Sequence, residues 1–302
     1  MDMKVELGAN TEVVTVGNQK GGCAKTTTTV NVSGAIARAG KKVLLIDMDP
    51  QGDATIALGL EKKDLKKTIN EILIDKIDLA EGIYPTKVQG LDVIPATIEL
   101  AGAELTISGM IGRESKLAHA LQAHKELLQK YDYIFIDTPP SLSLLTINAL
   151  AASHSVVIPV QTEYYALDGL GHLVKTVDMV REELNPNLHI KGVVLTLYDE
   201  RTHLSKEVGD EVRKFFKDKV YQTVIHRSIK MAEAPAQHEL GIDYDPDGRV
   251  TQEFLSLAKE ILAQRQNGSP TPASAPAPQA EAPPSPAPAK PAAPAADVSG
   301  GA

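Results

Sequence analysis

The chain has 302 residues, of which 43% are hydrophobic, and a formal net charge of −8. This hydrophobic content is enough for a substantial core, and the length allows one large domain or two small ones. The acidic balance argues against a protein that simply coats nucleic acid. No apolar run approaches the length that spans a bilayer, no signal peptide is visible, and a single cysteine permits no internal disulfide. We therefore expect a cytoplasmic protein.

The composition changes at Gly268. Ten of the nineteen prolines fall in the last 35 residues, among many alanines and serines. Such a segment buries too little apolar surface to offset the entropy of ordering it. We therefore predict a folded domain over residues 1–267 and a disordered, partly polyproline-like tail over residues 268–302.

Before the tail, apolar strand-like runs alternate with helical patterns. In chain order, strands are predicted at 12–17, 43–47, 91–95, 132–137, 155–160, 191–197 and 220–225. The helical patterns include 25–39, 114–130, 168–184, 204–217 and 251–265. Alternation of this kind predicts an α/β fold with a doubly wound, mostly parallel sheet and helices on both faces.

The first predicted strand runs into a glycine turn, a lysine and a run of threonines. Gly21 and Gly22 let the backbone approach bound oxyanions, and the helix that follows adds its positive end. Lys25 can then reach the β- and γ-phosphates while the Thr26 hydroxyl ligates Mg²⁺. This build predicts ATP and Mg²⁺ as cofactors, bound by Lys20, Gly21, Gly22, Cys23, Ala24, Lys25, Thr26 and Thr27.

The loop departs from the strict G-x-x-x-x-G-K-[ST] pattern, because Gln19 and Ala24 occupy its two glycine positions. Cys23, the only cysteine, is interpreted as a small space-filling side chain without chemistry of its own. Lys20 is an additional cation, placed before the glycine pair.

Two later strands end in acidic residues. Residues 43–47 lead into Met48 and Asp49, and residues 133–137 end in Asp137. Ligands collect at the carboxyl ends of the strands in a doubly wound sheet, so these carboxylates would face a bound phosphate. One suits the shell of a Mg²⁺ ion and the other suits a hydrolytic water. Asp47 is predicted to have a supporting role.

Three motifs carry a family resemblance. Lys-Gly-Gly-x-x-Lys-Thr at 20–26 resembles the deviant phosphate loop of the ParA/MinD group of P-loop ATPases. The segments 47–52 (DMDPQG) and 136–141 (IDTPPS) resemble the second and third nucleotide motifs of the chromosomal ParA (Soj) proteins, and the similarity extends over about residues 12–262.

The resemblance implies a P-loop NTPase fold and assigns roles. Lys20 would cross a dimer interface and stabilise the phosphates of the partner's nucleotide. Asp49 would orient the attacking water, and Asp137 and Asp49 would contact Mg²⁺ through water. Lys20, Lys25 and Asp49 are therefore the predicted catalytic residues, and Thr26, Asp137 and Asp49 the predicted metal-site residues.

A basic segment lies within this acidic chain. Residues 201–230 contain eight Lys or Arg and four Asp or Glu, a local charge of +4 that leaves −12 on the remainder. Such a segment can bind phosphate backbones without reading bases. The resemblance also implies non-specific DNA binding here, with Arg201, Arg227 and Lys230 as the predicted DNA-binding residues. Lys230 replaces the family's usual arginine, which keeps the charge but loses the planar fork.

Two other departures from the family concern this region. His226 stands where proline is usual, and residues 237–242 (QHELGI) differ from the usual Gly-Lys-Pro type. They affect the details of pocket closure and of the DNA contact and leave the ATPase motifs intact.

The function that we expect is an ATP-switched DNA-partition ATPase. An ATP-bound homodimer would bind DNA non-specifically and associate with the nucleoid. Slow hydrolysis, stimulated by a ParB-like centromere-binding protein, would reset it, since no arginine finger or glutamine base is evident. Because few residues precede the first predicted strand, we expect no helix-turn-helix domain and no sequence-specific operator binding.

Three alternative functions differ from this one in what they require of the sequence. A MinD-like membrane-associated regulator needs a terminal amphipathic membrane helix, whereas the last predicted helix carries few cations and a stripe that favours core packing: Phe254, Leu257, Ala258, Ile261 and Leu262. We therefore expect no membrane partner. A redox protein like the nitrogenase iron protein needs more cysteines than Cys23. A ParA-like positioner of another cargo stays open, because it shares the same motifs.

Overall fold

Within residues 7, 10–163 and 166–266, which the computed structural model describes, eight strands form one sheet in the order β3-β4-β2-β5-β1-β6-β7-β8. Only β3 is antiparallel to its neighbour β4, and the other pairings are parallel. The strands are β1 (Glu12–Val16), β2 (Val43–Asp47), β3 (Tyr84–Pro85), β4 (Leu91–Ile94), β5 (Tyr133–Asp137), β6 (Ser155–Gln161), β7 (His189–Tyr198) and β8 (Val220–His226).

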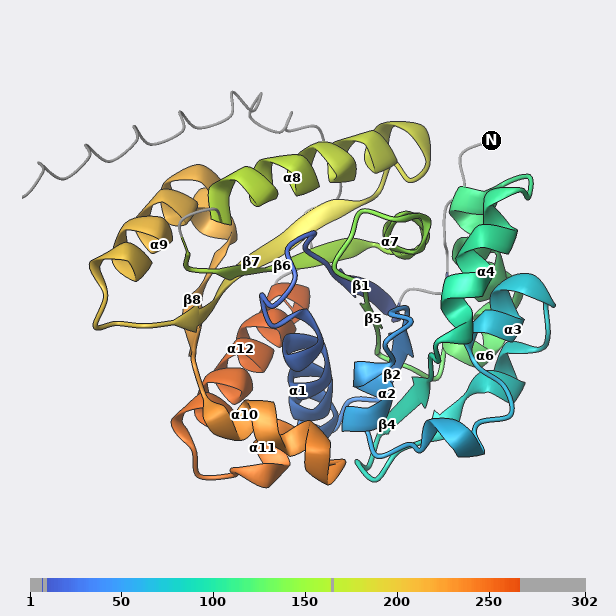
Figure 1. Ribbon diagram of the computed structural model, residues 1–302, viewed down its shortest axis with the longest axis horizontal. Coiled ribbons are helices and arrows are strands. Elements are labelled where there is room, and N and C mark those ends of the chain that lie inside the picture. Colours follow the sequence, from blue (N-terminus) through green and yellow to red (C-terminus); the bar gives the residue numbers. More distant parts are fainter. Residues whose placement is uncertain (1–6, 8–9, 164–165, 267–302) are drawn as a thin grey trace, which may run out of the picture.

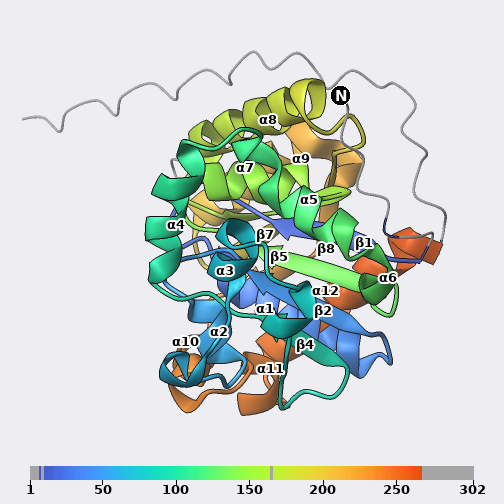
Figure 2. The ribbon, with the colours of Figure 1, turned by 90° about the vertical axis from the view of Figure 1, so that its right-hand side faces the viewer.

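Helices cover both faces of this sheet (Figure 1; Figure 2). They are α1 (Lys25–Arg38), α2 (Asp53–Ala57), α3 (Ile69–Ile74), α4 (Glu99–Ser108), α5 (Lys116–Ala123), α6 (Lys125–Leu128), α7 (Leu144–Ala151), α8 (Ala166–Glu183), α9 (His203–Phe216), α10 (Ile229–Glu233), α11 (Gly241–Tyr244) and α12 (Arg249–Gln266). Helices α1, α2, α11 and α12 pack on one face, and α3–α5 and α7–α9 pack on the other. The predicted doubly wound α/β fold is confirmed.

The central strands are apolar on both faces because each face is covered. In β2, Leu45 points to the α1 side while Leu44 and Ile46 point to the α3–α5 side. The same alternation places Phe135 of β5 on the α1 side and Ile134 on the other. A continuous apolar run is therefore the form that a doubly covered parallel strand takes.

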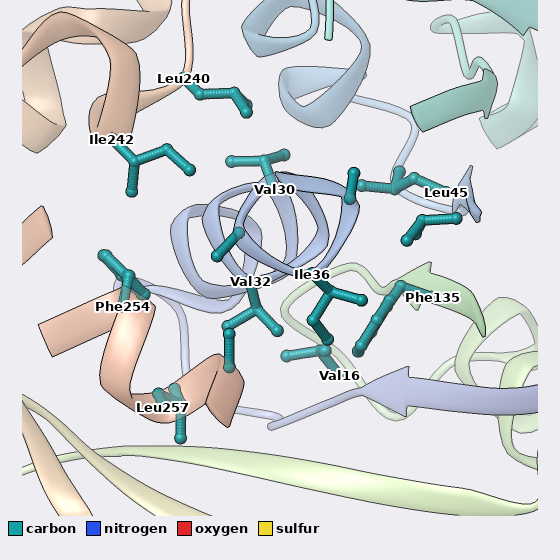
Figure 3. Packing of buried hydrophobic residues seen from close by; sticks show 14 of the residues in the cluster. Val16, Val30, Val32, Ile36, Leu45, Phe135, Leu240, Ile242, Phe254 and Leu257 are labelled. Atoms are coloured by element: carbon teal, nitrogen blue, oxygen red, sulfur yellow. The ribbon is translucent and has the colours of Figure 1, made fainter. Parts of the chain in front are cut away.

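Helix α1 lies at the centre of its layer. Figure 3 shows Val30, Val32 and Ile36 of α1 among side chains of the sheet and of the chain's last helices. Phe254 and Leu257 of α12 are fully buried in this cluster. The stripe on the last helix is thus a core-packing surface, as predicted. Among the described residues, no helix is long and apolar enough to cross a membrane.

Two local details differ from the sequence prediction. The expected helix over 114–130 is divided into a short turn at Arg113–Ser115, α5 and α6. The break falls at His124, whose side-chain Nε2 accepts a hydrogen bond from the Leu79 amide. The two-residue edge strand β3 was not predicted, because it is short and contains Pro85. The predicted tail at 268–302, and with it the boundary at 267, lie outside the described residues.

We predict that Phe254→Ala lowers the free energy of unfolding by about 3–5 kcal/mol, because it leaves a cavity between α12 and α1. Urea denaturation would measure this loss. The exposed Lys259→Ala on the same helix is the control and should change stability by less than about 0.5 kcal/mol. A small effect at Phe254 would contradict the packing of α12 described above.

Candidate functional site

The strand order brings three strand ends together. Strand β5 lies between β1 and β2, and Asp137 at its end is in register with Val16 of β1 and Asp47 of β2. Because all three strands are parallel, the loop after β1 and the acidic ends of β2 and β5 meet at one edge of the sheet. The residues that the sequence singled out for phosphate and metal are therefore neighbours.

The loop between β1 and α1 has the backbone of an anion cradle. Gly22 and Ala24 both adopt positive φ, at 71° and 63°. A Cβ on Gly22 would meet no atom within 4 Å, so the space above it is open. The loop leads directly into the amino-terminal end of α1, where backbone N–H groups and the helix dipole favour an anion. Its other side is fixed, since Thr196 of β7 donates a hydrogen bond to the Cys23 carbonyl at 3.0 Å.

Lys25 is folded back onto this loop. Its ammonium donates to the carbonyl of Lys20 at 3.0 Å, and only 6% of the residue is exposed. The Cys23 thiol donates to the same carbonyl at 3.2 Å and is fully buried. Burial raises the pKa of Cys23, which agrees with the space-filling interpretation of this residue. Two of the predicted loop residues, Lys25 and Cys23, thus share the carbonyl of Lys20.

Asp137 is the central carboxylate of the site. It is fully buried, and its two oxygens accept hydrogen bonds from Thr26 Oγ1 at 2.7 Å and Thr29 Oγ1 at 2.8 Å. Burial, together with the nearby charge of Asp47, raises the pKa of Asp137 to about 7. A cation beside it would favour the ionised form, and hydroxyl and carboxylate oxygens are the donors that Mg²⁺ prefers.

The two aspartates after β2 have different surroundings. Asp47 is fully buried and accepts three hydrogen bonds, from Thr55 N, Thr55 Oγ1 and Asp49 N. Asp47 therefore ties β2 to α2, which is the predicted supporting role. Burial raises its pKa to about 6. Asp49 is 8% exposed and accepts a hydrogen bond from the Gln51 amide at 2.9 Å. Burial also raises the pKa of Asp49.

The Lys20 side chain forms an ion pair within its own chain. Its ammonium lies 2.9 Å from Glu163 Oε2, just after β6, with the two side chains 28% and 49% exposed. Glu163 is not among the site residues predicted from the sequence. Neither is Thr29, although the spacing of Thr26 and Thr29 puts both hydroxyls on one side of a helix.

A cleft of about 370 Å³ lies beside the loop. It is bordered by Thr26 and Thr27 of α1, by Asp53 of α2 and by residues of the segment 231–241, including Pro235 and Glu239. This segment contains part of the stretch in which the sequence departs from the family, and it forms one wall of the cleft.

The predicted DNA-binding residues lie at the same carboxyl edge of the sheet. The ends of β7 and β8 are paired through Tyr198 and His226, which brings the loops carrying Arg201 and Arg227 together. Lys230 follows in α10 and lies over the Tyr244 ring at 5.3 Å. Arg201 is 85% exposed at its side chain and makes a two-pronged ion pair with Asp199, at 2.8 and 2.7 Å. Hydrogen bonds from Arg201 lower the pKa of Asp199 to about 2. The DNA-binding role of the three residues stays a prediction.

Comparisons with known proteins find a matching family model and similar sequences. A family model described as "AAA domain" matches residues 11–190. The sporulation initiation inhibitor protein Soj of Bacillus subtilis is 53% identical over 252 residues, which cover 83% of this chain and 98% of Soj. The chromosome partitioning protein ParA of Myxococcus xanthus is 41% identical over 258 residues, covering 85% of this chain and 90% of that protein.

A solved structure is similar over nearly the whole described part. Cobyrinic acid a,c-diamide synthase from Mycobacterium smegmatis, with bound ADP and magnesium, has a TM-score of 0.75 and 33% sequence identity. The match covers 88% of this chain and all of that one.

We predict that the stability of Asp137→Asn relative to the wild type increases as the pH rises from 5.5 to about 7 and then levels off towards pH 8, in protein without nucleotide and Mg²⁺. The folded-state pKa of Asp137, about 7, is above the ordinary value of 3.8, so the stability it contributes is complete below pH 3.8 and is lost as the pH rises through 7. Asparagine does not titrate. Thermal melts of both proteins would measure this. The free energy of unfolding of the variant, relative to that of the wild type, should increase by about 1–2 kcal/mol over this pH range. A difference independent of pH would contradict the raised pKa.

Proposed function

The chain belongs to the ParA/Soj family of partitioning ATPases, and from that premise we propose that its ATP-bound dimer binds DNA without sequence preference and is reset by slow, partner-stimulated hydrolysis. The single observation that supports this most is the convergence at one sheet edge of a phosphate loop, the buried Asp137 with its bond from Thr26, and a cluster of basic residues. A site that binds ATP and a surface that binds DNA would then share the same strand ends.

The nucleotide would bind along the loop from Lys20 to Thr27. The open space above Gly22 and the start of α1 suit the phosphates, and the similar Mycobacterium smegmatis structure holds ADP and magnesium. Mg²⁺ supplies neutralising charge to the phosphate oxygens when it is bound. Thr26 Oγ1 would contact it directly, while Asp137 and Asp49 would contact it through water.

Hydrolysis would then use residues that already lie near one another. Lys25 would leave the carbonyl of Lys20 for the β- and γ-phosphates. Asp49, at the end of the segment after β2, would orient the attacking water. Lys20 of a second copy would add positive charge to the transferring group, where a cation is most valuable. No further base is invoked, which is why we expect slow intrinsic turnover and stimulation by a ParB-like protein.

Pairing of two subunits would create the DNA-binding surface. One subunit offers Arg201, Arg227 and Lys230, a small number of phosphate contacts. A dimer presents two such clusters to one duplex, so the second cluster binds at a high effective concentration. DNA binding would therefore depend on ATP through dimer formation, and on salt through the number of phosphates that are neutralised.

We predict that Lys20→Ala removes most of the stimulated ATP turnover, because a cation at the transferring phosphoryl group can be worth roughly 10³–10⁵ in rate. Phosphate release would be measured with DNA and the ParB-like partner present. Lys175→Ala removes an exposed lysine of α8 and serves as the control. A normal stimulated rate in Lys20→Ala would contradict the trans-acting role.

We predict that DNA binding is strong with ATP and weak with ADP or without nucleotide, and that Arg201→Ala lowers the salt dependence of the ATP state. Each lost phosphate contact should reduce the slope of log affinity against log salt by about 0.9, so a dimer should lose about 1.8. Fluorescence anisotropy at several salt concentrations would measure both slopes. Arg113→Ala, at an exposed arginine preceding α5, is the control. An unchanged slope would place the DNA-binding surface elsewhere.

A further inference from the structure

We infer that Glu163 holds the Lys20 ammonium on its own subunit, so that two of these contacts must break whenever two subunits pair through their lysines. This inference deepens the proposed function and rests on its trans-acting lysine. Glu163 is a positioning residue in this account: it acts on Lys20 and does not touch the nucleotide.

The contact is part of a wider attachment of the loop. Three consecutive loop residues, Asn18, Gln19 and Lys20, each donate a side-chain hydrogen bond to the segment from β6 to the start of α8. Asn18 bonds the Pro159 carbonyl at 2.7 Å, Gln19 bonds the Gly169 carbonyl at 3.0 Å, and Lys20 bonds Glu163 at 2.9 Å. Of the three, only the Lys20 contact is an ion pair, and only its donor is a predicted catalytic group.

Glu163 is itself held in position. Its amide donates to the carbonyl of Gln161 at 2.8 Å, which makes a tight turn at the end of β6. The side chain of Gln161 donates to Glu163 Oε1, which leaves Oε2 for Lys20. The carboxylate that binds Lys20 is therefore held in place at the end of β6.

Residue 20 also connects this contact to the nucleotide. Its carbonyl accepts the Lys25 ammonium and the Cys23 thiol, while its own ammonium is bound to Glu163. When phosphates attract Lys25, the carbonyl of Lys20 loses its strongest donor and the loop from 20 to 23 becomes freer to move. Release of Lys20 from Glu163 is then the remaining step before the lysine can reach another subunit.

The exposure of the Lys20–Glu163 ion pair determines how strongly it can affect dimerisation. An ion pair as exposed as this one changes an equilibrium by about two- to five-fold. A symmetric dimer releases two lysines at once, so the effect on the dimer dissociation constant is the square, about 4- to 25-fold. The contact therefore raises the subunit concentration at which dimers form, but it does not prevent dimerisation.

The first experiment tests the contact in the nucleotide-free subunit, using Cys23 as a built-in probe. Cys23 is the only cysteine, is fully buried and bonds the Lys20 carbonyl, so a neutral thiol reagent such as N-ethylmaleimide reports opening of the loop. We expect Glu163→Gln and Lys20→Ala each to speed labelling by about two- to five-fold, and the double variant to be no faster than either. Glutamine keeps the acceptor for Gln161 and removes only the charge.

Two features make this result specific. Burial raises the pKa of the Cys23 thiol, and the positive charge of Lys20 opposes this rise, so a purely electrostatic effect on the thiolate would move the two variants in opposite directions. The control Glu182→Gln removes the same charge from the exposed surface of α8 and should label like the wild type. Labelling of Glu163→Gln at the wild-type rate would overturn the inference.

The second experiment measures pairing. Sedimentation velocity with Mg²⁺ and a non-hydrolysable ATP analogue should show Glu163→Gln dimerising at a concentration about 4- to 25-fold lower than the wild type and Glu182→Gln. An unchanged or weaker dimer would overturn the inference. Should the wild type itself fail to dimerise, the proposed function would be wrong, and the labelling experiment would still decide whether Glu163 holds Lys20.

Discussion

A carboxylate enclosed at the centre of the sheet edge is the constraint on which the rest of the site depends. Asp137 is fully buried, faces Asp47 in register and is held by two threonine hydroxyls. An ionised group in such a position is costly unless a cation or strong donors accompany it. Asp137 thus suits a neighbouring cation, and Thr26 Oγ1, which donates a hydrogen bond to it, is the predicted direct metal contact.

Helix α1 transmits this constraint to the core. Its first two turns carry Lys25, Thr26 and Thr29, while Val32 and Ile36 further along are buried against the sheet and α12. The loop before α1 can therefore be open at Gly22 and strained at Ala24, since the helix behind it is fixed. Helix α1 therefore combines a body that is rigidly packed in the core with an amino-terminal end that is accessible to an anion.

The two lysines of the phosphate loop, Lys20 and Lys25, would allow the site to act as a switch. In the structure, Lys25 and Lys20 both have partners within the subunit, the carbonyl of residue 20 and Glu163. In the proposed function, a nucleotide would compete for Lys25 and a second subunit would compete for Lys20. ATP binding, pairing and the joining of two basic clusters at β7 and β8 would then be consecutive exchanges of partners.

The sequence alone determined the α/β class, the phosphate loop and the acidic ends of two strands, because each is written in a short contiguous run of residues. It missed strand β3 and the break at His124, where two residues or one side chain decide the outcome. Only the tertiary structure decided that β5 lies between β1 and β2, which puts Asp137 against Thr26 and gives Asp47 a structural role. It likewise paired Lys20 with Glu163, 143 residues away. Such contacts depend on strand order and register, so the spacing of residues along the chain does not predict them.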